Sequence, residues 1–323
     1  MAKPVKRAKG KSGSKLVVYA ALAGNLAIAI TKFVAAAITG SSAMLSEGVH
    51  SLVDTTNEVL LLYGMSRAKK DPDRSHPFGY GRELYFWAFI VALLVFALGA
   101  GVSIYEGVAH LMHPEPMERP LVNYIVLLAS MVFEGASWLL ALRDFRSHKG
   151  DLGYFQAFRR SKDPTTFTVL FEDSAALLGL LIALAGVAAA QWLAMPRLDG
   201  VASIAIGIVL AISSLLLARE TKGLLIGESA HPQVRDAILR IAGADADVRS
   251  ANGVLTVQMG PDQVVAALSA EFRDGLDSNR IEACVNRIEA AIKQSHPVVS
   301  VLFVKPQTRA VWGGRTSGLD DKA

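Results

Sequence analysis

The chain has 323 residues, of which 52% are hydrophobic, and the apolar residues gather into long runs. Runs of 18 or more apolar residues can cross a bilayer as a helix, because each helical residue rises about 1.5 Å, so the composition predicts an integral membrane protein. The net charge of +4 is modest, and no nucleic-acid partner is expected. The single cysteine, Cys284, excludes an internal disulfide and a zinc cluster built on several cysteines.

The chain begins with a basic segment (1–14), rich in Lys, Gly and Ser, which we expect to be disordered. It leads into the first apolar run without a clear small-residue cleavage site, so no cleaved signal peptide is expected. Six apolar runs predict an α-helical transmembrane domain over 15–222. The spans are expected at roughly 16–38, 43–64, 84–108, 121–142, 166–190 and 200–218.

The basic residues predict the orientation of these spans. The N-terminal tail carries six Lys or Arg, the 65–83 connection five and the 143–165 connection six, whereas the opposite connections carry none, one (Arg119) and one (Arg197). Because basic loops stay in the cytoplasm, both termini are expected there. If the source is prokaryotic, the membrane is expected to be the cell (inner) membrane.

From about residue 223 the pattern becomes that of a soluble domain. We predict helices over 231–242 and 280–295, strands over 253–259, 263–272 and 300–304, and a turn at Gly260-Pro261-Asp262. The order α-β-β-α-β predicts an α+β domain over 223–307, with helices on one face of a sheet whose edges suit a dimer contact. Cys284 is expected to be a small buried residue of its second helix. The tail, 308–323, is expected to be disordered.

The second span carries a polar stripe. Glu47, His50, Asp54 and Asn57 step by three, four and three residues, so they share one helix face, and Glu58 lies beside them. An ionised group at the bilayer centre costs about 2.5–3.5 kcal/mol on insertion scales, which indicates a functional role. His50 and Asp54, one turn apart, can reach a single metal ion. The alternative is a His–Asp hydrogen bond that stabilises helix packing; the neighbouring acids favour a path for metal ions or protons.

Other spans carry acidic residues as well. Glu172 and Asp173 are adjacent in the fifth span, and because neighbours on a helix point about 100° apart, we expect one of them, Asp173, to face the second span. The other is expected to pair, to accept a proton or to lie nearer the cytoplasmic end; in the alternative, both only cap the span. Glu134, in the fourth span, is expected to reach the same cavity or to bond to a neighbouring helix. Asn25 and Lys32, in the first span, are expected to snorkel or to bond between helices.

The connection over 71–83 contains two further candidate ligands, Asp73 and His76. Two ligands make an incomplete, weak metal site. The competing interpretation is a rigid loop, rich in Pro and Gly, that positions the third span.

Three segments together resemble the cation diffusion facilitator family of metal/proton antiporters: SEGVHSLVD (46–54), HPFGYGR (76–82) and LFEDSAALLG (170–179). The runs FEGASWLLAL and KDPTTFTVLFEDSAALLG look most like the branch that includes the mitochondrial zinc exporter. The resemblance implies a homodimer, each protomer having six spans and a cytoplasmic, metallochaperone-like domain. It also implies a transport site between the second and fifth spans, coupled to inward proton flow.

The chain departs from the family pattern at three places. Many members have two ligands, four residues apart, in each of these two spans, whereas Val169 stands four residues before Asp173 here. Tyr80 stands where the loop site of some members has a His. The strand 256–263 and the end 301–307 lack the His and Asp residues that bind regulatory zinc elsewhere.

These patterns predict a divalent cation exporter, with Zn²⁺ as the first choice of cargo and no permanently bound cofactor. The predicted ligands are His50, Asp54 and Asp173, with Glu172, Glu134, Asn57, Glu47 or water completing the shell. Mn²⁺, Fe²⁺ and Co²⁺ remain alternatives, because one imidazole with several carboxylates also suits them. A membrane metalloprotease would need a His-Glu-x-x-His set, which is absent. A non-transporting metal sensor or scaffold is the remaining alternative.

Overall fold

The computed structural model describes residues 13–114, 119–149, 153–154 and 161–320. The chain divides into two compact units. The first, called here the bundle unit, comprises 1–63, 88–150 and 165–218; the second, the C-terminal unit, comprises 64–87, 151–164 and 219–323.

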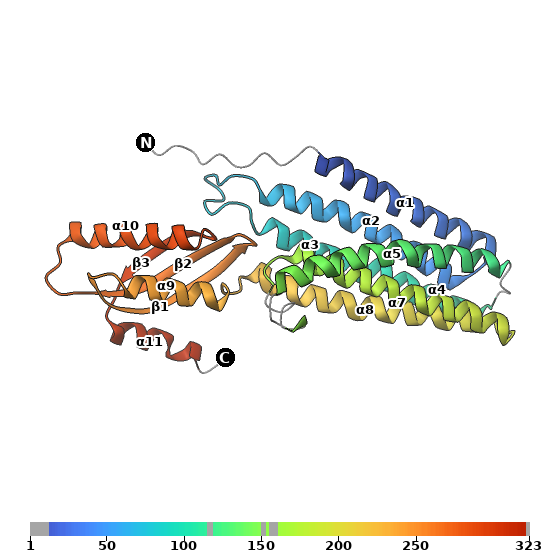
Figure 1. Cartoon of the computed structure of the whole chain (residues 1–323). Helices are drawn as coiled ribbons and strands as arrows, with labels where there is room; N and C mark the ends of the chain where they lie inside the picture. The colour runs from blue at the N-terminus through green and yellow to red at the C-terminus, as the bar shows by residue number, and fades with distance from the viewer. Residues whose placement is uncertain (1–12, 115–118, 150–152, 155–160, 321–323) are drawn as a thin grey trace. The chain divides into compact units, whose positions relative to one another are not determined.

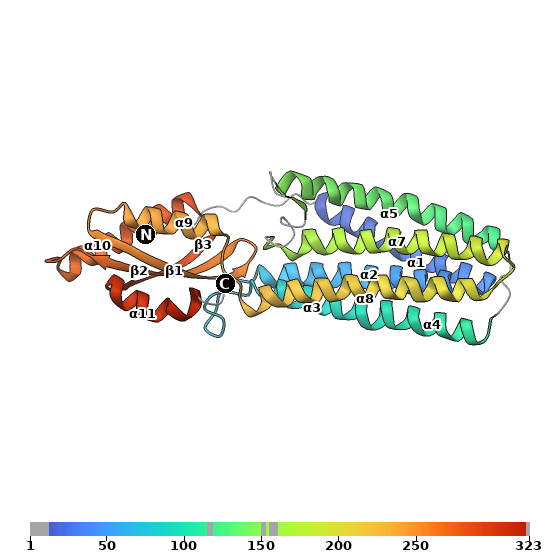
Figure 2. The same cartoon turned by 90° about the horizontal axis from the view of Figure 1, so that it is seen from below.

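Long helices that run alongside one another form the bundle unit (Figures 1 and 2). One span is continuous through α3, a π-helical segment η1 and α4, so the helices of the described residues make six spans. Their bounds are α1 Gly13–Thr39, α2 Ser42–Ala68, α3 Glu83–Leu94, η1 Val95–Ala100, α4 Gly101–Met112, α5 Pro120–Lys149, α7 Pro164–Trp192 and α8 Arg197–Ile226.

Five of these spans are long and apolar enough to cross a membrane: Leu22–Thr39, Glu83–Met112, Pro120–Arg146, Phe167–Trp192 and Arg197–Ile226. Helix α2 is not among the five, because its polar stripe lowers its hydropathy. The stripe is nevertheless buried inside the bundle, with Glu47 and Asn57 fully covered. The predicted helical membrane fold is therefore confirmed, and α2 is its polar inner member.

Polar contacts at one end of the bundle fix the start of α2. The carboxylate of Asp199, at the start of α8, accepts hydrogen bonds from the Ser41 hydroxyl at 2.8 Å and from the Ser42 backbone N–H at 2.6 Å. Asp199 is only 1% exposed, so this cap satisfies donors of α2 that the helix itself leaves free.

Helices α4 and α8 pack closely near this end of the bundle. A Cβ on Gly107 of α4 would lie 2.6 Å from the carbonyl oxygen of Gly200 on α8.

The sheet of the C-terminal unit has the strand order β1-β2-β3, with β1 antiparallel and β3 parallel to β2. Ile238, Leu268, Cys284 and Ile288 belong to the core between helices and sheet, which confirms the predicted α-β-β-α-β order and the burial of Cys284. The elements are α9 Pro232–Gly243, β1 Val248–Gly260, β2 Gln263–Phe272, α10 Ser278–Ser295, β3 Val299–Pro306 and α11 Arg309–Asp320.

Helix α11 corrects one prediction. The segment after Gln307 was expected to be disordered, but 309–320 form a helix. Its Trp312 lies against Gly253 of β1, where an added Cβ would come within 2.4 Å of the indole ring. The absence of a side chain at Gly253 therefore makes room for the helix. Most of the predicted N-terminal tail lies outside the described residues, and Gly13 and Ser14 belong to α1.

Candidate metal transport site

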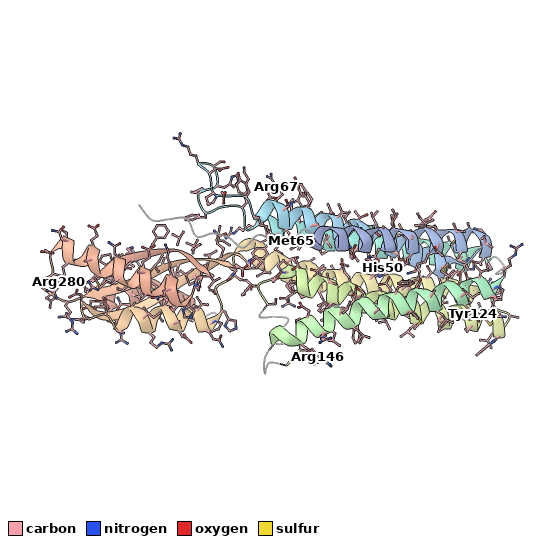
Figure 3. The ribbon with its side chains drawn as sticks, turned by 45° about the horizontal axis from the view of Figure 1, so that its top comes forward. His50, Met65, Arg67, Tyr124, Arg146 and Arg280 are labelled. Atoms are coloured by element: carbon pink, nitrogen blue, oxygen red, sulfur yellow. The ribbon has the colours of Figure 1, made fainter. Side chains whose placement is uncertain are left out.

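The inward face of α2 carries the predicted ligand pair. His50 is 1% exposed, and its Nδ1 lies 3.4 Å from Oδ1 of Asp54, whose side chain is 20% exposed. Neither ring nitrogen of His50 nor Oδ1 of Asp54 has a hydrogen-bond partner among the described residues. Buried polar atoms of native proteins are normally satisfied, so unpartnered lone pairs that converge from one helix turn indicate a ligand site. Figure 3 shows His50 inside the bundle.

Helix α7 presents its two acids to different neighbours. Oε1 of Glu172 accepts a hydrogen bond from Nδ2 of Asn57, on α2, at 2.8 Å. Oδ2 of Asp173 accepts one from the Ser137 hydroxyl, on α5, at 2.9 Å. The hydrogen bond to α2 therefore comes from Glu172, whereas Asp173 bonds to α5 and lines one cavity with Asp54 of α2. The rotation of α7 gives each acid its own partner helix, and both acids reach the cavity.

One cavity of about 120 Å³ brings most of the candidates together. Its lining includes five carboxyl groups, contributed by Asp54 and Glu58 of α2, Glu134 of α5, and Glu172 and Asp173 of α7. Carboxylates this close together in a low-dielectric bundle need cations or protons to compensate their charge. The cavity can therefore hold a metal ion, protons, or each in turn. Glu134 reaches this cavity, which was one of its two expected positions.

Glu47 lies apart from this group. Its Oε2 accepts a hydrogen bond from Nζ of Lys32, on α1, at 3.1 Å, and Lys32 also donates to the Ser51 hydroxyl at 2.8 Å. The side chains of Lys32 and Glu47 are both 0% exposed. Lys32 does not snorkel but bonds between helices, the second of its two expected roles. An ammonium group already compensates Glu47, which is therefore a poorer candidate ligand than the cavity carboxylates.

Sequence reasoning noted Glu58 in the second span but did not name Ser51 or Ser137, which line the cavity with it. Asn25, also in the lining, donates to Oε1 of Glu58 at 2.7 Å, so it bonds between helices, one of its two expected roles. Ser51 and Ser137 have no sequence signal because serine is common in packed membrane helices.

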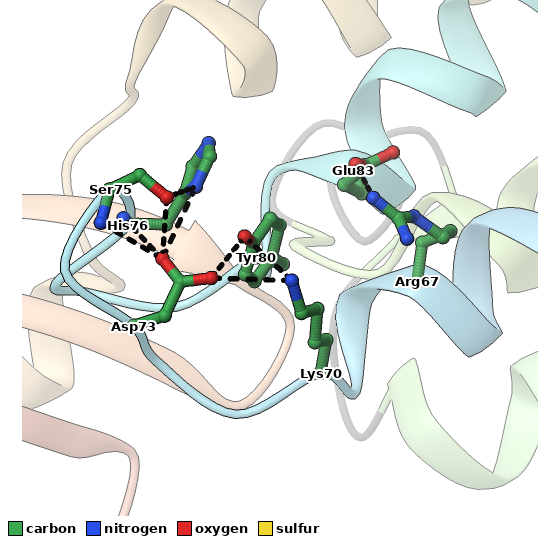
Figure 4. A network of polar contacts seen from close by, with 7 residues as sticks. All are labelled: Arg67, Lys70, Asp73, Ser75, His76, Tyr80 and Glu83. Carbon is green, nitrogen blue, oxygen red and sulfur yellow. Dashed lines mark hydrogen bonds and ion pairs between the residues drawn. The ribbon is translucent and has the colours of Figure 1, made fainter.

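The connection between α2 and α3 shows what replaces a loop metal site. Asp73 accepts hydrogen bonds from the Tyr80 hydroxyl at 2.6 Å, from Lys70 Nζ at 3.2 Å and from the Ser75 hydroxyl at 2.7 Å (Figure 4). These bonds, that of Tyr80 first, hold the pKa of the Asp73 carboxyl well below its usual range. Both of its oxygens are engaged and Lys70 balances its charge, so the contacts favour a rigid loop over a metal site of Asp73 and His76.

In the C-terminal unit, Asp245, Asp247 and Cys284 place potential ligand atoms within 4.8 Å of one another. Arginines already occupy the carboxylates, because Arg287 bonds to both of them at 2.9 Å and Arg280 to Asp247 at 2.8 Å. The Arg287 contacts contribute most to lowering the pKa of Asp245 to about 2, and burial raises the pKa of the Cys284 thiol to about 11. A protonated thiol beside arginine-bound carboxylates is a poor metal ligand, so the group is an ion-pair network.

A family model for the cation efflux transmembrane domain matches residues 18–226, which include every residue of the cavity. The chain belongs to this family. It is 34% identical over 287 residues to the mitochondrial proton-coupled zinc antiporter of Xenopus laevis, covering 86% of this chain and 51% of that protein. The human protein of the same name is 34% identical over 263 residues, covering 80% of this chain and 46% of that protein.

The chain thus spans about half the length of these antiporters. The cation-efflux pump FieF of Cronobacter sakazakii is 27% identical over 298 residues, covering 90% of this chain and 92% of the pump. The resemblance to the cation diffusion facilitators, near the branch of the mitochondrial zinc antiporter, is confirmed by these matches. The relatives carry the names of an antiporter and of an efflux pump, and the matched domain is a transmembrane one.

Proposed function

We propose that this protein exports a divalent metal ion, Zn²⁺ first, in exchange for protons. The observation that carries the proposal is the pair of unpartnered ligand groups on α2, His50 and Asp54, beside a cavity lined by five carboxyl groups. The relatives' names support it, since they are a proton-coupled zinc antiporter and a cation-efflux pump.

In this proposal His50, Asp54 and Asp173 are the primary ligands. Glu172, held by Asn57, completes the shell or accepts a proton. Glu134, of α5, lines the same cavity and serves as a further proton acceptor. Tetrahedral Zn²⁺ accepts one imidazole nitrogen and two or three carboxylate oxygens, which is the donor set offered here.

Proton exchange follows from the chemistry of these ligands. A carboxylate oxygen or imidazole nitrogen binds either a proton or a metal ion through the same lone pair, so metal entry expels protons and protonation expels metal. An alternating-access cycle therefore loads metal from the cytoplasm, changes which side of the bundle is open, and releases metal as protons enter from the far side.

The donor set also suits metal ions other than Zn²⁺. An oxygen-rich shell with one imidazole binds Mn²⁺, Fe²⁺ or Co²⁺ as well, and these are the alternatives to Zn²⁺. A non-transporting sensor would have little use for five carboxyl groups around one cavity inside a membrane, because each is costly to bury there.

The remaining parts of the proposal concern topology and assembly. The asymmetry of Lys and Arg supports cytoplasmic N- and C-termini. The α+β sheet supports a homodimer through the C-terminal domain, as in the family. A cell (inner) membrane is proposed if the source is prokaryotic, whereas the antiporter relatives are named as mitochondrial.

Flux in proteoliposomes tests the proposal. Reconstituted protein should move Zn²⁺ when a pH gradient is imposed, and Asp54→Ala and Asp173→Ala should each reduce that flux at least tenfold while the protein stays folded. Asp236→Asn, an acid on the exposed surface of α9, is the matched control and should transport normally. Wild-type flux in both site variants would refute the assignment, and no metal flux by the wild-type protein would refute transport.

A further inference from the structure

The cavity of the candidate site stops short of one end of the bundle. On α2 its lining extends from Ser51 to Leu61, and on α1 it includes Asn25 and Ile28. Ser51 marks its limit toward the end of the bundle at which α1 is joined to α2, called here the far end. In the proposed topology the far end is the non-cytoplasmic one.

An ion pair occupies the space directly beyond this limit. Lys32 Nζ lies 3.1 Å from Oε2 of Glu47 and donates at 2.8 Å to the hydroxyl of Ser51, which itself lines the cavity. The second carboxylate oxygen, Oε1 of Glu47, lies against α7, because a Cβ on Gly179 would come within 2.5 Å of it. The side chains of Lys32 and Glu47 are both 0% exposed. The pair therefore connects α1, α2 and α7 at the closed side of the cavity.

Buried apolar side chains continue this closed layer toward the far end. One helical turn nearer the start of α2, Ala43 and Met44 are fully buried. Leu180 and Ala183 of α7 and Ile206 of α8 are fully buried as well and belong to the same core cluster. In this structure the ion pair and the apolar layer behind it therefore separate the candidate transport site from the far end.

A buried ion pair is a costly way to close such a layer. Uncharged side chains of similar volume would be about as stable there, because the loss of hydration offsets the attraction between the two charges. The pair differs from uncharged side chains in a second, open state. When the layer opens and water enters, both charges regain their hydration, whereas apolar side chains gain nothing. The pair thus stabilises the closed layer by mutual attraction and also lowers the cost of a hydrated, open one.

We propose that Lys32 and Glu47 form the gate between the transport site and the far end of the bundle. The gate opens when the two side chains separate and each takes up water, and it closes when they pair again. A divalent cation in the cavity attracts the carboxylate and repels the ammonium, so loading of the site weakens the pair. This link to metal rests on the proposed function, whereas the control of access by the pair does not.

Thiol labelling measures access to the closed layer without depending on transport. The parent chain carries Cys284→Ala, which removes its single cysteine, and Ala43→Cys as the probe. Position 43 is 0% exposed and lies one helical turn from Glu47. The matched control probe is Met195→Cys, because Met195 lies in the connection between α7 and α8 and is 50% exposed. In proteoliposomes, a membrane-impermeant thiol reagent is added on the side from which the control probe reacts.

Single and double neutralisation of the pair should act in opposite directions. Glu47→Gln leaves the ammonium without its partner in the closed layer, so the open state is favoured and labelling of Ala43→Cys should rise about tenfold or more. Adding Lys32→Met removes the remaining charge and should return labelling to the parent rate or below it. Met195→Cys should react equally in all three backgrounds. If Glu47→Gln does not fold, Lys32→Met alone leaves the opposite charge unpaired and should raise labelling in the same way.

Two labelling results would overturn the gate. One is equal labelling of Ala43→Cys in the parent and in both variants. The other is an equal rise in Glu47→Gln and in the double variant, since lost packing and not charge would then explain the access. The melting temperature of each variant identifies any rise that comes from unfolding.

Transport separates this proposal from the proposed function. The double variant should still bind Zn²⁺, as equilibrium dialysis measures, but should transport it several-fold more slowly, because its layer opens less often. Wild-type flux in the double variant would count against the gate and leave the transport site untouched. No Zn²⁺ flux by the wild-type protein would refute the proposed function, and labelling would still decide whether the pair controls access.

Discussion

The buried ion pair between α1 and α2 allows a quantitative test of what holds the site together. Lys32→Met keeps the length and apolar stem of the side chain but removes its charge. Lys32 Nζ lies 3.1 Å from Glu47 Oε2 and donates to Ser51 at 2.8 Å, and the side chains of Lys32 and Glu47 are 0% exposed. The substitution therefore leaves a carboxylate without its cation in the interior of the bundle.

The expected magnitude follows from that burial. Removing one partner of a buried ion pair costs about 3–5 kcal/mol, because the remaining charge loses its partner but gains no water. Replacing both partners by uncharged groups of similar volume changes the free energy of unfolding little. Lys32→Met should therefore destabilise the protein by at least about 3 kcal/mol, and Glu47→Gln in the same chain should recover most of this loss.

Thermal unfolding of the purified protein measures the effect. One kcal/mol shifts the melting temperature of a chain of this size by about 2 °C, so Lys32→Met should lower it by roughly 6 °C or more. Lys293→Met is the matched control, because Lys293 pairs with Glu289 at 2.6 Å on the surface of α10, with 46% and 33% of the side chains exposed. Exposed pairs contribute under about 1 kcal/mol. Equal losses in Lys32→Met and in the double variant would refute the reasoning.

Three further predictions concern other contacts. Glu172→Gln keeps an oxygen that Asn57 can bond but removes the charge, so Zn²⁺ flux should fall several-fold; unchanged flux and pH dependence would show that Glu172 serves only in packing. Arg287→Ala should lower the melting temperature slightly at pH 7. The pKa of Asp245 is depressed from 3.8 to about 2, so its stabilising contribution is complete above about pH 4 and disappears as the pH falls toward 2. The difference between Arg287→Ala and wild type should therefore vanish over that window, and a constant difference would contradict the linkage. Tyr80→Phe should raise the pKa of Asp73, measurable by NMR titration, because the hydroxyl makes the largest contribution to lowering it.

Hydrophobic pattern alone predicts that the membrane segments are helices and how many there are. It also predicts the order of elements in the C-terminal domain. They are predictable because each depends on local hydrophobic pattern, as in α10, where Cys284, Ile288 and Ile292 recur on one face and are buried together. Helix α11 was not predictable in this way. It depends on a distant partner, since Trp312 packs against Gly253.

The candidate site shows the same division between local and distant information. The step from His50 to Asp54 lies within one helix, so the sequence predicts that their side chains are neighbours. The choice between Glu172 and Asp173 depends on how α7 is rotated against two other helices, and adjacent residues differ too little in pattern to reveal it. Lys32 was ambiguous for a similar reason, because its partner Glu47 lies on another helix.

Val169 shows how the cavity compensates for the ligand that α7 lacks. It lines the cavity one turn before Asp173, where many family members carry a second ligand, so this part of the wall offers no donor atom. Glu172, Glu134 and Glu58 surround the same space with carboxyl groups instead. Replacing an imidazole by carboxylates shifts a site toward harder ions and adds groups that can carry protons. In the proposed function, the departure at position 169 therefore bears on which ion is chosen and on how many protons are exchanged, while metal binding itself depends on His50, Asp54 and Asp173.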